Sequence, residues 1–140
     1  MKILKEIYDG LLFSVPVAPP ETGGLIGGKN ETIRFFEIVD GDNSEDKAFF
    51  SPNIEAVGLV LSHWNDRNIE FLGFFHTHPY CCPNLSFEDK EYAKQIMRTV
   101  SYNKQFLYFP IVLPKKEIIF YKATYIGKKI DFMIDNVERW

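Results

Sequence analysis

The run IEFLGFFHTHP, residues 69–79, restricts the fold of this chain more than any other stretch. It is rich in aromatic and other strand-forming residues, and Pro79 stops it because proline has no backbone N–H to donate to a sheet. We therefore expect a strand over residues 69–78. Side chains two positions apart in a strand share a face, so His76 and His78 project together and continue the Leu72–Phe74 face.

The remaining segments indicate helices mixed with hairpin-linked strands. Residues 2–14, 53–66 and 86–102 have apolar residues at helical spacing. The inward positions expected for the last two helices are Ile54, Val57, Val60, Leu61, Trp64, Ala93, Ile96, Met97 and Val100. The expected strands are residues 31–39, 105–113, 117–126 and 129–135, with a hairpin turn at 28–30 and a polar loop at 41–52. Without repeats or linkers, the pattern predicts a single α+β or α-β-α layered domain over residues 1–140.

Composition and charge argue against several classes of partner. The chain has 46% hydrophobic and 16% aromatic residues, which is typical of a globular protein. Its net charge is −3 and it has no basic cluster, so we expect no nucleic-acid partner. No apolar run approaches the ~20 residues of a membrane span, and charged residues interrupt the N-terminal run, so no signal peptide is expected. Two adjacent cysteines form no disulfide framework, which fits a cytoplasmic protein.

The histidine pair is a candidate metal site. Two imidazoles on one face of a strand can hold a single zinc ion. The alternative is two ordinary histidines at the end of a strand, and an isolated H-x-H pattern does not separate the two interpretations.

Ser86 and Asp89 strengthen the metal hypothesis. Ser86 begins the third expected helix, and Asp89 lies on the helix face that carries the inward apolar residues. A buried carboxylate needs a partner, and zinc would supply one. S-x-x-D is also typical of a capping box, in which Ser86 caps the helix and Asp89 lies near its N-terminus. The two interpretations are compatible for Ser86 but compete for Asp89.

Cys81 and Cys82 are the alternative ligands. Ligands from one segment normally need a spacer of two or more residues to reach one tetrahedral ion, and these two have none. At most one cysteine could join the histidines, and four protein ligands would close the site to water. A structural zinc domain that uses a cysteine therefore stays an alternative to a catalytic site, with a lining or packing role as the other use of the cysteines.

The glycine-rich segment GGLIGGKN, residues 23–30, nearly matches a phosphate-binding loop. It lacks the hydroxyl that binds Mg²⁺, prolines precede it, and a strand rather than a helix follows it, so we expect no nucleotide site. The glycines instead indicate close backbone approach, within the sheet or by a ligand. His63 lies off the apolar stripe of its helix and is expected at the surface or at an interface.

The combined motif resembles that of the JAMM metalloproteases, also called JAB/MPN domains. His76-Thr77-His78, seven residues, Ser86, two residues and Asp89 match the signature H-[ST]-H-x7-S-x-x-D. The segment from Glu21 to Gly28 is similar to the upstream pattern E-[ST]-x-G-x-L-x-G, with its leucine one place early. The order of elements also fits along nearly the whole chain. Two departures are the leucine where a proline commonly precedes the serine, and the cysteine-containing PYCCPN between the ligands.

The resemblance implies a mixed β-sheet packed between helices and one catalytic zinc ion. It assigns His76, His78 and Asp89 as zinc ligands with water in the fourth position, Glu21 as the general base, and Ser86 as a stabiliser of the oxyanion. Three protein ligands plus water is the open arrangement of catalytic zinc sites.

The implied activity is zinc-dependent hydrolysis of a peptide or isopeptide bond. The expected substrate is a ubiquitin-like or sulfur-carrier protein cut after its C-terminal Gly-Gly, whose extended tail would bind by strand addition beside the zinc. The alternative is a non-catalytic interaction module of the same family. Such modules generally lack the ligands or the glutamate, which this chain keeps. Nothing in the sequence indicates an oligomeric state.

Overall fold

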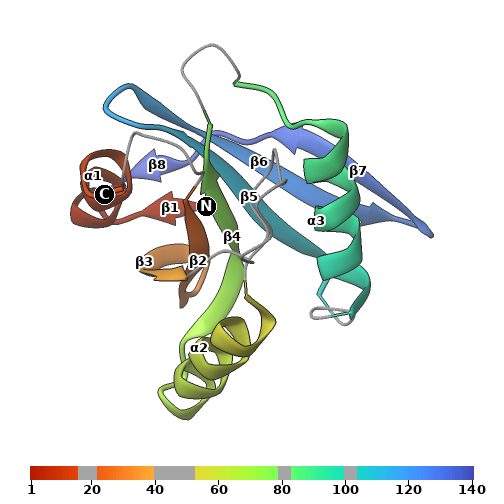
Figure 1. Ribbon diagram of the computed structural model, residues 1–140, viewed down its shortest axis with the longest axis horizontal. Coiled ribbons are helices and arrows are strands. Elements are labelled where there is room, and N and C mark those ends of the chain that lie inside the picture. Colours follow the sequence, from red (N-terminus) through yellow and green to blue (C-terminus); the bar gives the residue numbers. More distant parts are fainter. Residues whose placement is uncertain (16–21, 40–52, 79–82, 100–103) are drawn as a thin grey trace.

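The computed structural model describes residues 1–15, 22–39, 53–78, 83–99 and 104–140, and Figure 1 shows the arrangement of their elements. Within these described residues, three helices and eight strands occur in the chain order β1 (Lys2–Ile3), α1 (Lys5–Phe13), β2 (Gly23–Lys29), β3 (Thr32–Val39), α2 (Ile54–Asp66), β4 (Glu70–Thr77), α3 (Phe87–Thr99), β5 (Phe106–Leu113), β6 (Glu117–Ile126), β7 (Lys129–Ile134) and β8 (Glu138–Arg139).

All eight strands belong to one mixed sheet, in the order β7-β6-β5-β4-β2-β3-β1-β8. The hairpins β2/β3, β5/β6 and β6/β7 are antiparallel, as is the pair β2/β4. Strand β4 is parallel to β5, and α3 lies in the connection between them. This topology places β4, the histidine strand, inside the sheet rather than at its edge.

The helices cover the two faces of this sheet. On one face, α1 packs its leucines Leu11 and Leu12 against a core from the sheet that includes Ile26 and Phe75. On the other face, α2 and α3 pack over a second core. The buried helix residues of that second core are Val57, Trp64, Ala93, Ile96 and Met97. The expected α+β architecture, with a mixed sheet between helices, is confirmed.

Three expected details of the elements are wrong. Lys2–Ile3 is a strand rather than part of a helix, because Ile3 is fully buried and pairs with Ile33 of β3. The hairpin turn lies at Asn30–Glu31 rather than at residues 28–30. Both turn residues have positive φ, which a two-residue hairpin loop of type I′ requires. Ile54 is 85% exposed, because it follows the N-cap Asn53 at the very start of α2 and does not reach the core. The polar loop at 41–52 and Val100 lie outside the described residues.

Strand β4 carries a β-bulge that the alternating pattern does not reveal. Ile26 of β2 pairs with Gly73, whereas the next residue of β2 pairs with Phe71, so Leu72 is the extra residue of β4. Leu72 consequently packs on the α1 side, and Phe74 packs on the side of α2 and α3. The expectation that Leu72 and Phe74 share a face is therefore wrong.

Glycines allow the strands around β4 to lie close together. A Cβ built on Gly24 would lie 1.9 Å from the backbone oxygen of Glu37, and one built on Gly73 would lie 1.7 Å from that of Tyr108. The glycine-rich segment is thus a strand packed within the sheet, which is one of the two uses expected for its glycines, and not a phosphate-binding loop. No described helix has the length and apolar character needed to cross a membrane.

Candidate metal centre

The sheet holds the C-terminal end of β4 from both sides. His76 is the register partner of Gly23 on β2 and of Ile111 on β5. Beyond it, the backbone N–H of Thr77 donates to Thr22 (2.8 Å), and that of His78 donates to Val112 (3.0 Å). The backbone that carries both histidines is therefore fixed by hydrogen bonds, and their side chains lie on the face covered by α3, in line with Phe74.

Helix α3 begins with a reciprocal capping box. The backbone N–H of Asp89 donates to Ser86 Oγ (3.0 Å), and the backbone N–H of Ser86 donates to Asp89 Oδ2 (2.9 Å). These bonds satisfy two donors that the start of a helix would otherwise leave unpaired. They also turn the carboxylate of Asp89 inward, where Asp89 is 7% exposed.

The side chains of His76, His78 and Asp89 converge on one point. The Nε2 atoms of the two histidines are 2.8 Å apart. His76 Nε2 lies 3.3 Å from Asp89 Oδ1, and His78 Nε2 lies 3.1 Å from Asp89 Oδ2. Asp89 therefore caps the helix and faces the histidines at the same time, so the expectation that these two roles compete is wrong. A carboxylate has two oxygens and several lone pairs, which is enough for both.

The charge state of Asp89 suits a ligand. Burial by itself raises the pKa of this carboxyl group. Hydrogen bonds from His76 and His78, the charge of His76 and the backbone N–H of Ser86 outweigh burial and hold the pKa of Asp89 well below its usual range. The group is therefore an ionised carboxylate at neutral pH.

The three side chains fit a metal ion. Their ligand atoms all lie within 4.8 Å of one another. Two imidazole nitrogens and one carboxylate oxygen, each about 2.0–2.1 Å from a tetrahedral ion, would be about 3.3 Å apart. The observed separations of 2.8, 3.1 and 3.3 Å are close to this value. Within the described residues, the geometry identifies a candidate metal-binding triad of His76, His78 and Asp89.

The inner wall of the triad is tightly packed. A cavity of only about 20 Å³ adjoins it, lined by Phe74, Phe75, His76, Leu85, Asp89, Tyr92 and Phe109. This volume is about that needed for a single water molecule. Nothing larger than a water molecule therefore fits on this side of the triad.

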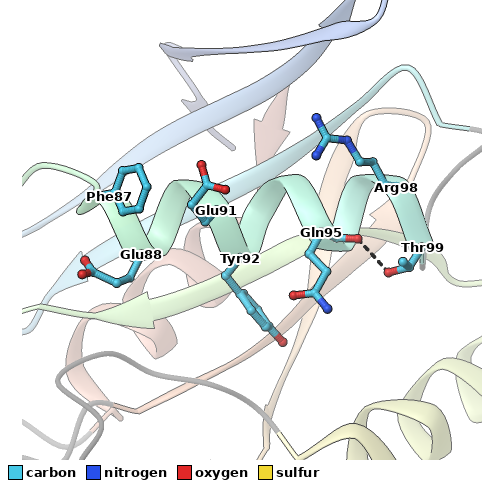
Figure 2. Close-up of a pocket in the computed structure, with 7 residues that line it drawn as sticks. All are labelled: Phe87, Glu88, Glu91, Tyr92, Gln95, Arg98 and Thr99. Carbon is cyan, nitrogen blue, oxygen red and sulfur yellow. Dashed lines mark hydrogen bonds between the residues drawn. The ribbon is translucent and has the colours of Figure 1, made fainter.

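A second depression, of about 500 Å³, lies along the outer surface of α3 and contains none of the three triad residues. Figure 2 shows its lining residues: Phe87, Glu88, Glu91, Tyr92, Gln95, Arg98 and Thr99. It offers no group of histidine and carboxylate ligands comparable to the triad among its lining residues. Tyr92 lines both spaces.

Glu21, Cys81 and Cys82 lie outside the described residues, so the assignments made for them stay predictions. The residue after Glu21 is described: Thr22 donates its backbone N–H to Thr77 Oγ1 (2.9 Å) and accepts from the Thr77 backbone. The sequence analysis assigned no role to Thr77. Its place between two histidines of a strand was the available signal, because it puts the Thr77 side chain on the sheet face opposite to theirs. His63 is exposed on α2, as expected.

Strand addition at the histidine strand is excluded. Both neighbours of β4 are already in place at His76, so no edge of β4 is open to a substrate strand there. In the described sheet the outermost strands are β7 and β8. The expected strand addition of a substrate tail beside the triad stays a prediction, and β4 is not the strand that could pair with it at His76.

Comparisons with known proteins agree with this architecture. A family model described as prokaryotic homologs of the JAB domain matches residues 13–124. A solution structure of a protein from Desulfitobacterium hafniense is 16% identical at a TM-score of 0.68, covering 100% of this chain and 93% of that chain. One from Salinibacter ruber is 13% identical at a TM-score of 0.60, covering 99% and 91%.

A crystal structure of a JAB1/MPN domain protein from Archaeoglobus fulgidus is 16% identical at a TM-score of 0.46, covering 99% of this chain and 98% of that chain. No curated protein matches the sequence significantly. At these identities, the first two structures show a shared fold and nothing about substrates.

Proposed function

Because this chain belongs to the family of prokaryotic homologs of the JAB domain, we propose that it is a zinc-dependent hydrolase of peptide or isopeptide bonds. The observation that carries the proposal is the convergence of His76, His78 and Asp89, which come from two elements and meet with their ligand atoms 2.8–3.3 Å apart. A structural site is typically closed by four protein ligands, whereas a catalytic site keeps one position open. The described triad has three.

His76, His78 and Asp89 are the residues that would hold the ion. Bound zinc supplies Lewis acidity, which polarises a carbonyl group and lowers the pKa of water to about 7. The ionised state of Asp89 and the fixed backbone of β4 keep these three groups in position without rearrangement. Holding reactive groups in place beforehand is a large part of what an enzyme contributes to rate.

Glu21 is the proposed general base. Its neighbour Thr22 is hydrogen-bonded twice to Thr77, the residue between the two histidines, which supports this role. The Glu21 carboxylate would accept a proton from the attacking water and pass it to the leaving amine. Hydrolysis then needs no acyl-enzyme intermediate.

Ser86 is the proposed oxyanion donor. Its Oγ accepts a hydrogen bond from the backbone N–H of Asp89, which leaves the hydroxyl proton to be donated elsewhere. Ser86 is partly exposed next to the triad, so the hydroxyl would donate to the oxygen of a substrate carbonyl as negative charge develops on it.

The proposed substrate is the C-terminal Gly-Gly tail of a ubiquitin-like or sulfur-carrier protein. The packed wall beside His76 and Asp89 leaves no room for a substrate side chain on that side. Glycine has no side chain and lets a carbonyl approach such a centre closely. The class of substrate is proposed from the family, and the Gly-Gly tail is proposed from the packed wall beside the triad.

Metal analysis after dialysis tests the ligands. The parent protein is expected to retain about one zinc ion per chain, and His78→Ala is expected to lose it. His63→Ala is the matched control, since His63 is exposed on α2, and it should retain the metal together with Cys81→Ala and Cys82→Ala. Zinc retained by His78→Ala but lost from a cysteine variant would contradict the site.

Mass spectrometry of cleavage products tests the reaction. Zinc-loaded protein is incubated with ubiquitin-like fusions that carry either Gly-Gly or Ala-Val at the junction. Cleavage after Gly-Gly alone is the expected result. Equal cleavage of both junctions would indicate a general peptidase, and zinc binding without cleavage of any fusion would favour the non-catalytic interaction module.

A further inference from the structure

We propose that Tyr121 of β6 is a positioning residue for the metal centre. The Tyr121 hydroxyl binds the segment before α3 to the sheet and so fixes the position of Asp89 relative to the two histidines. The inference rests on one part of the proposed function, which is that the triad binds a metal ion, and it does not depend on hydrolysis. Tyr121 touches none of the three triad side chains through the contacts described, so it acts through the backbone that carries Asp89.

The contacts of the hydroxyl carry this inference. Tyr121 Oη donates to the backbone oxygen of Pro83 (3.2 Å) and lies 3.3 Å from Asn84 Oδ1. The backbone of Leu85 also forms a hydrogen bond with this group. One side chain of the sheet thus contacts three consecutive residues, 83–85, immediately before Ser86.

Tyr121 comes from the interior of the sheet. Its register partners are Phe109 on β5 and Ile134 on β7, and its side chain is only 9% exposed within the core beneath α3. Figure 1 shows β6 next to β5 in the sheet, with α3 on the same side of the molecule. Phe109 in turn lines the small cavity beside His76 and Asp89. The hydroxyl is therefore a fixed point close to the triad.

The triad needs such a fixed point. Sheet hydrogen bonds place the two histidines, but the capping box places Asp89 only relative to Ser86. Neither set of bonds places the start of α3 relative to β4. The contacts of Tyr121 with residues 83–85 do this, together with the packing of Leu85 in the core. Metal affinity depends on this relative placement, because outer contacts that orient ligands are often worth 10- to 100-fold in binding.

The hydroxyl keeps its proton at neutral pH, as a donor to Pro83 must. Burial raises the pKa of Tyr121, and the hydrogen bond with the backbone of Leu85 lowers it by less. The tether is therefore present at neutral pH.

Tyr121→Phe tests the inference, because it removes the hydroxyl and keeps the ring in the core. Tyr108→Phe is the matched control: it removes another buried hydroxyl, one that donates to Asp135 (2.5 Å) from the core beneath α1. Two quantities are measured for both variants and the parent. One is zinc affinity by chelator competition, and the other is amide hydrogen exchange of Asp89 and Lys90 in metal-free protein, reported relative to amides of β5.

We expect Tyr121→Phe to bind zinc about 10-fold more weakly and its two α3 amides to exchange about fivefold faster, with neither change in Tyr108→Phe. Parental zinc affinity in Tyr121→Phe would overturn the inference, as would parental exchange or equal changes in both variants. A parent that binds no zinc overturns the proposed function, and the exchange measurement separates the two failures. If the parent binds no zinc, faster exchange confined to Tyr121→Phe supports the tether, and unchanged exchange refutes it.

Discussion

Replacing Ser86 with alanine separates the two roles that the structure gives this residue. The substitution removes the acceptor of the Asp89 N–H, a bond of 3.0 Å, and leaves the reciprocal bond from the Ser86 backbone to Asp89 Oδ2. Half of the capping box is lost, so the free energy of unfolding should fall by about 1 kcal/mol. For a chain of this size, the melting temperature should fall by about 3–5 °C.

The effect on rate should be much larger. A loss of about 1 kcal/mol from a typical stability of 5–15 kcal/mol leaves nearly all molecules folded, so unfolding cannot reduce turnover appreciably. Loss of an oxyanion donor should reduce turnover by about 10²–10³. Asp89 keeps its carboxylate and its bond to the Ser86 backbone, so zinc should be retained.

The assay combines urea unfolding, zinc analysis and cleavage of a Gly-Gly fusion. Thr99→Ala is the matched control, since its hydroxyl donates to Gln95 (2.7 Å) in the exposed last turn of the same helix. That variant should lie within about 0.5 kcal/mol of the parent and retain full activity. Lower stability with unchanged turnover would make Ser86 a helix cap only, and unchanged stability would refute the capping argument.

Three further predictions concern other parts of the molecule. Glu21→Gln should retain zinc and lose about 10²–10⁴ in turnover, and full activity on the Gly-Gly fusion would place the base elsewhere. Burial, and then the carboxylate of Asp135, raise the pKa of the Tyr108 hydroxyl in the folded protein. The hydroxyl therefore ionises more easily in the unfolded chain, and the free energy of unfolding should fall as pH rises above about 10. Urea titrations at pH 8 and pH 10.5 check this, and Tyr108→Phe should weaken the dependence. Gly73→Ala, at φ 154° and in collision with backbone, should lose several kcal/mol by urea unfolding, whereas Gly58→Ala, with nothing within 4 Å, should gain about 0.5–1 kcal/mol.

The parts of the site that follow from local geometry could be predicted from the sequence. Residues two apart in a strand face the same way, so His76 and His78 had to project together once β4 formed. Residues three apart at a helix start can bond reciprocally, so Ser86 and Asp89 were expected to form a cap, and they do. These relations depend on a few consecutive residues and on backbone hydrogen bonds whose geometry hardly varies between proteins.

Relations between distant segments were decided only by the tertiary structure. The bulge at Leu72 moves that side chain to the opposite face, because one extra residue shifts the alternation of a strand. Asp89 could not be known to cap and to face both histidines until α3 was placed over the sheet. The contact of Tyr121 with Pro83 spans 38 positions, and no local period links them. Such contacts depend on how the helices pack on the sheet. Sequences with the same local pattern can form that packing in different ways, so the pattern alone does not determine the contacts.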